Sequence, residues 1–158
     1  MSTLEVKAIQ APSGFDLQMP AGHIVQTVYA NTDSETATSS SSWVATTLSA
    51  SITPKFASSK ILVRYDALMY QYINTQGAST IYRGSTEVTG ETFGITRSWK
   101  SDSRGFFPHT GAWLDSPNTT SATTYTIYVR KNSGDYDINF PTSAADSKPS
   151  ITLMEVAQ

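Results

Sequence analysis

The sequence has no cysteine, which excludes disulfide bonds and thiolate metal sites. Charged residues make up only 15% of its 158 positions, where about 25% is usual for a soluble domain. Lysine and arginine form no cluster and the net charge is −2, so the electrostatic signature of nucleic-acid binding is missing. Serine and threonine, at roughly a quarter of all positions, supply polarity instead. Threonine favours strands because its branched Cβ fits a pleated surface.

Long apolar runs and a basic, hydrophobic start are also absent. No stretch approaches the roughly 20 apolar residues of a membrane span, and the first residues do not resemble a signal peptide. We therefore expect that the protein is made in a cytoplasm and is not inserted into a membrane. A protein of this kind would act outside the cell only after lysis or within an assembled particle.

The residue patterns of common catalytic sites are missing as well. His23 and His109 are the only histidines, and their positions predict surface or loop residues, because a metal site needs several ligands at suitable spacing. There is no Gly-x-Ser-x-Gly nucleophile motif and no phosphate-binding glycine loop. Arg64 and Asp66 share a strand face, which favours a cross-strand ion pair over a catalytic carboxylate. We therefore expect no enzyme and no cofactor.

Aspartates elsewhere have a simpler interpretation. They lie in or near predicted turns, where the aspartate side chain commonly bonds backbone groups. These residues are Asp102, Asp115, Asp135 and Asp137.

What the sequence does contain is the period-two pattern of strands. Residues 60–73 give the clearest signal: Ile61, Val63, Tyr65, Ala67 and Met69 alternate with Leu62, Arg64, Asp66 and Leu68. Shorter strands are predicted at 24–29, 43–53, 80–83, 92–99, 106–114, 125–130, 136–140 and 150–156. Turn signals recur about every ten residues. The pattern predicts an all-β antiparallel β-sandwich or jelly roll without a helix of useful length.

Three connecting segments complete this prediction. Residues 132–135, Asn-Ser-Gly-Asp, predict a hairpin turn between the strands on either side. Residues 31–42 are rich in serine and threonine and predict a loop. Residues 1–22 predict an extended N-terminal arm, followed by a sandwich domain over 23–158. The apolar residues of the arm, Leu4, Val6 and Ile9, are too few for a core and are candidates for docking on a partner or a neighbouring subunit.

Two further groups of residues are candidate contacts. Leu62, Leu68, Tyr70 and Tyr72 occupy the second face of the long strand and are candidates for the subunit interface of a homotrimer. Trp99 and Trp113 flank a stretch containing glycine and serine and are candidates for contact with a glycan. Packing in the core is the alternative interpretation of these aromatic residues.

Several patches together resemble small virion structural proteins, of tail-fibre type, from marine and freshwater bacteriophages, including cyanophage-like ones. The patches follow one another along nearly the whole chain, at residues 2–10, 48–54, 58–63, 82–86, 114–117, 120–125 and 150–156. Residues 91–109 match this pattern least. The resemblance implies a virion protein with a trimeric jelly-roll head, by analogy with the globular heads of tumour-necrosis-factor and complement type.

The resemblance leaves more than one role open. A trimeric tail-fibre or host-adhesion module is favoured, with other virion proteins and possibly a host-surface glycan as partners. The alternative is a trimeric capsid decoration protein that clamps neighbouring capsid subunits. A glycan depolymerase is a remote third possibility, since no carboxylate pair stands out. Each role places the protein in the virion.

Overall fold

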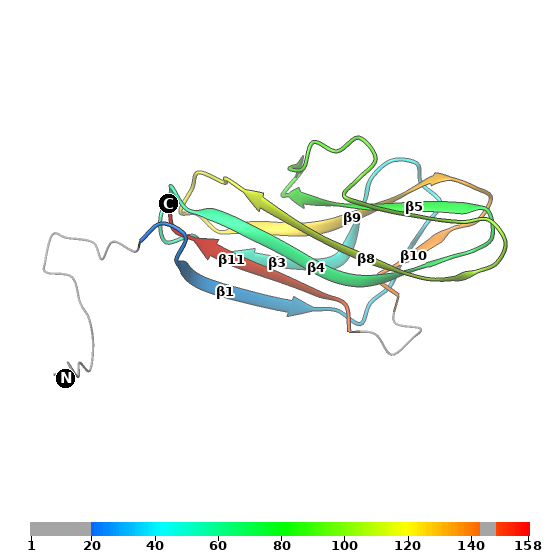
Figure 1. Ribbon diagram of the computed structural model, residues 1–158, viewed down its shortest axis with the longest axis horizontal. Helices are drawn as coiled ribbons and strands as arrows, with labels where there is room; N and C mark the ends of the chain where they lie inside the picture. Colours follow the sequence, from blue (N-terminus) through cyan, green and yellow to red (C-terminus); the bar gives the residue numbers. More distant parts are fainter. Residues whose placement is uncertain (1–19, 143–147) are drawn as a thin grey trace, which may run out of the picture.

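Two antiparallel sheets pack face to face in the computed structural model, which describes residues 20–142 and 148–158 (Figure 1). Every regular element in these residues is a strand, so the predicted all-β sandwich is confirmed. The first sheet, called sheet A here, contains β1 (Ile24–Asn31), β2 (Thr36–Thr38), β4 (Lys60–Gln71), β8 (Gly105–Asp115), β10 (Ile138–Phe140) and β11 (Ser150–Val156). The second, called sheet B, contains β3 (Val44–Ile52), β5 (Thr75–Arg83), β6 (Thr86–Glu87), β7 (Thr96–Lys100) and β9 (Thr123–Ser133).

The strand order is that of a jelly roll. The strands of five residues or more run β1-β11-β4-β8 in sheet A and β3-β9-β5-β7 in sheet B. Counted along the chain, these are strands 1-8-3-6 and 2-7-4-5, the arrangement of two nested Greek keys. Strands that follow one another in sequence therefore lie mostly in opposite sheets, and both sheets contribute to one core.

The core lies between the sheets and follows the predicted alternation of β4. Its inward residues Ile61, Val63, Tyr65 and Met69 have no exposed surface, and Ala67 is buried. The other sheet and the neighbouring strands contribute Leu48, Ile52, Ile81, Tyr125, Ile127, Val129, Ile138, Phe140, Ile151 and Leu153. Each large apolar side chain buried in this way contributes about 1.5–3 kcal/mol, so the alternation on β4 is a main determinant of the fold.

The predicted hairpin at residues 132–135 is wrong. β9 belongs to sheet B, whereas β10 pairs with β2 and β4 in sheet A, so the connection crosses between sheets. The turn itself is present, since Gly134 has φ +105° and approaches the backbone of Asn74 too closely for a side chain. A glycine turn followed by alternating apolar residues occurs equally in a hairpin and in such a crossing, so the local pattern does not separate them.

Two other segments differ from the prediction. The serine- and threonine-rich stretch at 31–42 contains β2, which pairs with β10 at the margin of sheet A. The strand predicted over 92–99 begins only at Thr96, because residues 91–94 form a turn in which Gly94 has φ +84°.

The two ends of the described chain meet at one end of the sandwich, called the proximal end here (Figure 1). The Gly22 amide donates to the Ala157 carbonyl at 2.8 Å, and the Ala157 amide donates to the His23 carbonyl at 2.9 Å. The opposite, distal end carries the β4–β5 turn, the β7–β8 connection and residues 134–137. Residues 1–19 of the predicted arm, including Leu4, Val6 and Ile9, lie outside the described residues.

Candidate functional site

The residues that the structure describes contain no group of three or more histidine, aspartate or glutamate side chains placed to hold a metal ion. They also contain no helix long and apolar enough to cross a membrane. The features of the described residues that could carry a function are the buried polar side chains and the two outer faces of the sandwich.

His109 is fully buried, so its predicted place on the surface or in a loop is wrong. It lies in the middle of β8, where Pro108 and Thr110 face outward and the alternation turns the imidazole inward. Its Nδ1 lies 2.7 Å from the Ser79 hydroxyl and its Nε2 lies 2.6 Å from the Ser98 hydroxyl. Burial lowers the pKa of His109 from 6.5 to about 3, so the ring is neutral at physiological pH.

This serine–histidine arrangement is structural rather than nucleophilic. Both nitrogens of the ring are occupied by serines, no carboxylate of the described residues contacts it, and Ser79 and His109 are closed to solvent. The Ser79 hydroxyl also lies 2.9 Å from the hydroxyl of Tyr65 on β4. The network therefore joins β5 and β7 of sheet B to β4 and β8 of sheet A.

The same network orients β7. Its residues Thr96 and Ser98 face the interior, where Thr96 donates to the Thr110 carbonyl at 2.5 Å. The alternate residues Arg97 and Trp99 consequently face outward on sheet B. Trp99 is 62% exposed, the largest exposed fraction among the large apolar side chains of the described residues.

The structure does not bring the two predicted glycan contacts together. Trp99 is paired with Gln76 in sheet B, whereas Trp113 is paired with Val63 in sheet A and packs against the core. A joint stacking surface of the two tryptophans is therefore not formed. Contact of either residue with a glycan stays a prediction, and the exposed ring of Trp99 is the better placed.

Other aromatic rings on the outer side of sheet B are already engaged. Tyr82 and Tyr128 stack with ring centroids 3.8 Å apart. The Arg130 guanidinium lies 4.5 Å from the ring centre of Trp43, and it donates to the Thr92 carbonyl at 2.6 Å. Sequence reasoning missed these pairs because the partners are far apart in the chain.

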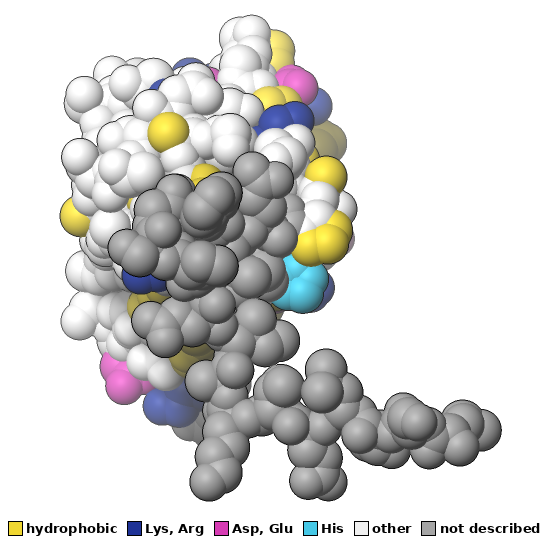
Figure 2. Space-filling view, turned by 90° about the vertical axis from the view of Figure 1, so that its left-hand side faces the viewer, with side chains coloured by type: hydrophobic (Ala, Val, Ile, Leu, Met, Phe, Trp, Pro, Cys, Tyr) yellow, Lys and Arg dark blue, Asp and Glu magenta, His cyan; other side chains and the backbone are white. Residues whose placement is uncertain are grey.

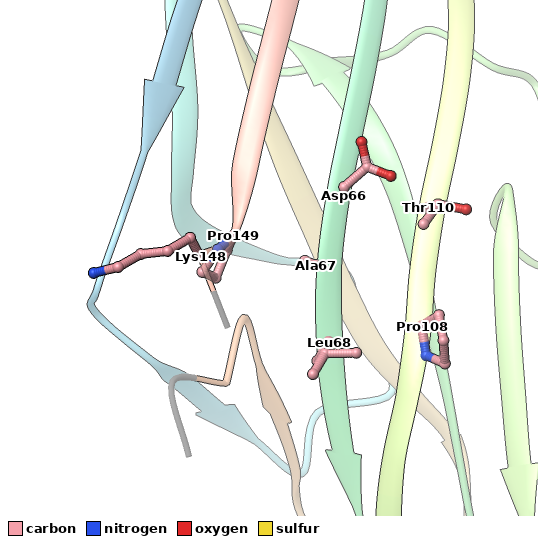
Figure 3. Close-up of a pocket in the computed structure, with 7 residues that line it drawn as sticks. All are labelled: Asp66, Ala67, Leu68, Pro108, Thr110, Lys148 and Pro149. Atoms are coloured by element: carbon pink, nitrogen blue, oxygen red, sulfur yellow. The ribbon is translucent and has the colours of Figure 1, made fainter. Parts of the chain in front are cut away.

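The outer face of sheet A carries two apolar groups, one toward each end, with Arg64 and Asp66 between them. The predicted interface residues Leu62, Leu68, Tyr70 and Tyr72 all face outward and are half-buried. By register, Leu62 lies between Leu114 and Met154, Leu68 is opposite Pro108, and Tyr70 is opposite Phe106. Figure 3 shows Leu68 and Pro108 on adjacent strands beside a shallow hollow that is also lined by Asp66 and Thr110.

Aromatic rings extend this face at its distal end. The Tyr70 ring centre lies 5.1 Å from that of Tyr72 and 5.0 Å from that of Phe106. Tyr136 continues the group, 5.3 Å from Tyr72. Phe106 and Tyr136 are 42% and 48% exposed, so the edge of the group is open to solvent.

The charged pair on this face lies along one strand, not across two as predicted. Arg64 and Asp66 both belong to β4, and their side chains approach to 3.2 Å. Their exposed fractions are 64% and 47%, so the pair contributes little to stability. The pair places one charge of each sign in the middle of the outer face of sheet A.

Two carboxylates at the proximal end, those of Asp115 and Glu155, are buried, which the sequence does not predict. Asp115 does not bond backbone as predicted; it accepts hydrogen bonds from Arg83 at 2.7 Å and from Tyr125 at 2.6 Å. Glu155 accepts from the Gln26 side chain at 2.7 Å and from two backbone amides of the β3–β4 loop. These bonds hold the pKa of Glu155 below its usual value in spite of its burial. Both carboxylates are satisfied, as expected of structural residues.

Charges elsewhere are sparse. In the part of the proximal end that Figure 2 colours by type, white predominates, which marks the backbone and uncharged polar side chains, and the charges of both signs lie in small separate groups. The chain matches no protein-family model, and no curated protein sequence is significantly similar to it.

Proposed function

We propose that the protein is a non-enzymatic bacteriophage virion protein that assembles as a homotrimer and serves as a tail-fibre-type module for host adhesion. The resemblance of the sequence to such virion proteins supports the location in a particle. The apolar outer face of sheet A is the structural observation that carries the proposal.

A face of this kind favours a protein partner. Leu114 and Phe106 are 46% and 42% exposed, and they adjoin half-buried apolar residues on β4. Monomeric soluble proteins rarely leave large apolar patches uncovered. The two apolar groups span neighbouring strands of one sheet on either side of Arg64 and Asp66, and this arrangement suits a flat protein–protein contact.

The partner that fits best is a second copy of this chain. The face carries Arg64 and Asp66 as a balanced pair, so two copies can meet there without net repulsion. Identical subunits usually close around a symmetry axis, so the contact face of every subunit is covered by a neighbouring subunit. The choice of three subunits follows from the resemblance to trimeric heads.

A non-enzymatic role agrees with the state of the buried polar groups. His109 is enclosed between two serines, Asp115 is bonded to Arg83 and Tyr125, and Glu155 is bonded to Gln26 and backbone amides. Each of these groups has its hydrogen-bond partners inside the protein, as structural groups do.

Sedimentation and native mass spectrometry test the assembly. We expect the mass of three 17.1 kDa chains at micromolar concentration. Leu114→Glu places a charge on the outer face of sheet A at a half-exposed position, so we expect a folded monomer. Ala45→Glu places the same charge at an exposed position of β3 on sheet B and should leave the trimer intact. A monomeric wild-type protein would contradict the proposal.

Quantitative mass spectrometry of purified particles tests the location and the role. A copy number comparable to that of the tail fibres is expected for the adhesion module. A copy number comparable to that of the major capsid protein would favour capsid decoration instead. Absence from the particle would contradict both.

A further inference from the structure

We propose that Trp99, Arg97 and Gln76, at the distal end of the outer face of sheet B, bind a saccharide that carries carboxylate groups. This inference deepens the adhesion function proposed above and rests on it for the source of the saccharide, a host cell surface. The site itself is argued from the side chains that follow.

Trp99 supplies the flat apolar surface on which a sugar ring stacks. Its 62% exposure is unusual for a residue that normally buries a large area, and it lies within a strand rather than in a loop. Tryptophan suits such contacts because it offers a large rigid area at a low cost in conformational entropy.

The strand that carries Trp99 is held firmly from behind. The Ser98 hydroxyl lies 2.6 Å from Nε2 of the buried His109, and the Ser98 carbonyl accepts a hydrogen bond from Gln71 at 3.3 Å. Thr96 is bonded to the β8 backbone. Because the inward residues of β7 are fixed, its backbone is held in place, which lowers the backbone entropy lost when a ligand binds the outward residues.

Gln76 supplies polar contacts beside the ring. It lies directly opposite Trp99 in the β5–β7 register and is half-buried. Within the described residues its side-chain amide makes no hydrogen bond, so both its donor and its acceptor are available. An amide can satisfy a sugar hydroxyl in either direction.

Arg97 supplies the charge that selects an acidic ligand. It lies on the same face of β7 as Trp99, and its guanidinium carbon is 5.2 Å from the ring centre of Phe93. No carboxylate of the described residues pairs with it, in contrast to Arg64 and Arg83, which are bonded to Asp66 and Asp115. A planar guanidinium held on an aromatic ring is well suited to a carboxylate, which it binds with two parallel hydrogen bonds.

The site stays open in the proposed assembly. The trimer contact uses the outer face of sheet A, whereas Trp99 and Arg97 face outward from sheet B. The site also lies at the distal end, away from residue 20 and the C-terminus at the proximal end (Figure 1). Particle attachment, subunit contact and ligand binding thus use separate surfaces.

Calorimetry and tryptophan fluorescence with three tetrasaccharides test this inference: tetragalacturonate, tetramannuronate and the neutral cellotetraose. We expect the wild-type trimer to bind at least one of the acidic probes more tightly than cellotetraose. Trp99→Ala should weaken this binding by about tenfold or more, because aromatic anchors commonly dominate the affinity of a contact. Arg97→Gln should remove the preference for the acidic probe. Lys55→Gln, which changes an exposed cation at the proximal end, should bind as the wild type does.

Three outcomes would overturn the inference: no binding of either acidic probe, unchanged binding by Trp99→Ala, or equal binding of acidic and neutral probes. Sedimentation of the same samples separates this result from the proposed assembly. A trimer that fails to bind contradicts only the saccharide site, whereas a monomer contradicts the proposed function.

Discussion

Tyr125 of β9 donates a 2.6 Å hydrogen bond to the Asp115 carboxylate of β8, and this bond joins the two sheets at the proximal end. The same carboxylate oxygen accepts from Arg83 of β5 at 2.7 Å. Burial, followed by the bond to Asp115, raises the pKa of the Tyr125 phenol above its usual range. The phenol therefore stays protonated and remains a donor at neutral pH.

Removing this hydroxyl should destabilise the fold without changing its shape. We expect Tyr125→Phe to lower the free energy of unfolding by about 1–2 kcal/mol, because a buried carboxylate loses one of its two donors. Urea denaturation at pH 7 measures the change. Tyr29→Phe removes an exposed hydroxyl and should leave the midpoint unchanged. Equal stability of the two variants would show that the bond between the sheets contributes nothing.

The buried His109 predicts a loss of stability in mild acid. Its pKa is about 3 in the folded protein and about 6.5 in the unfolded chain. Below pH 6.5 the unfolded chain therefore binds a proton that the folded protein does not, and the free energy of unfolding falls until the pH reaches the folded pKa. Between pH 7 and pH 5 the loss should be about 2 kcal/mol. Glu87 and Glu155, whose pKa values are lowered, add to the loss only below about pH 4.5.

Two variants and one spectroscopic measurement assign this effect. Urea midpoints measured from pH 7 to pH 5 should decline in the wild type and in His23→Gln, because His23 is exposed. The decline should vanish in His109→Gln. The nuclear magnetic resonance signal of the His109 ring in the wild type should stay in its neutral form at pH 5, and a titration near pH 6.5 would contradict the prediction.

Two glycines on β8 predict opposite responses to an added methyl group. A Cβ at Gly111 would lie 2.6 Å from Cε1 of the fully buried Tyr65 ring, whereas one at Gly105 would meet no atom closer than 3.8 Å. We expect Gly111→Ala to destabilise the protein by about 1–3 kcal/mol through overpacking. Gly105→Ala should be neutral or slightly stabilising, since alanine restricts the unfolded chain. Thermal denaturation of the two variants provides the comparison.

Deleting residues 2–20 tests the predicted docking arm. The described fold begins with the contact between Gly22 and Ala157, and β1 starts at Ile24. We therefore expect the truncated protein to form the same oligomer with a nearly unchanged melting temperature. Incorporation into particles, measured by complementation of a phage that lacks the gene, should be lost. Failure to fold would place the segment in the core, and normal incorporation would place docking on the body.

The sequence predicts the faces of single strands better than the pairing between them. On β4 the alternation assigns Ile61 and Val63 to the core, and both are fully buried. Alternation depends on local geometry, in which successive side chains point to opposite sides of a sheet. β10 pairs with β4 instead of β9. This pairing depends on the arrangement of the other strands in the two sheets, which the residues of one strand do not determine.

Buried polar residues were the hardest to predict. His109 and Asp115 look like surface or turn residues because aspartate is mostly exposed and histidine is intermediate in burial. Their partners Ser79, Ser98, Arg83 and Tyr125 become neighbours only when the sheets stack. The sequence singles out Trp99 as a candidate contact residue. That Gln76 lies beside it follows only from the β5–β7 register, which the sequence does not show.

The meeting of Gly22 with Ala157 determines how the molecule responds to force. A pull applied between the two ends of the described chain would open β1 from β11 one hydrogen bond at a time, starting at the Ile24–Val156 pair. A pull applied between residue 20 and a ligand on β7 would run along the length of the sandwich instead. It would load many backbone hydrogen bonds in shear at once, the direction in which a β-sheet resists rupture best. A domain anchored only through its N-terminal side would therefore bear tension along its strands.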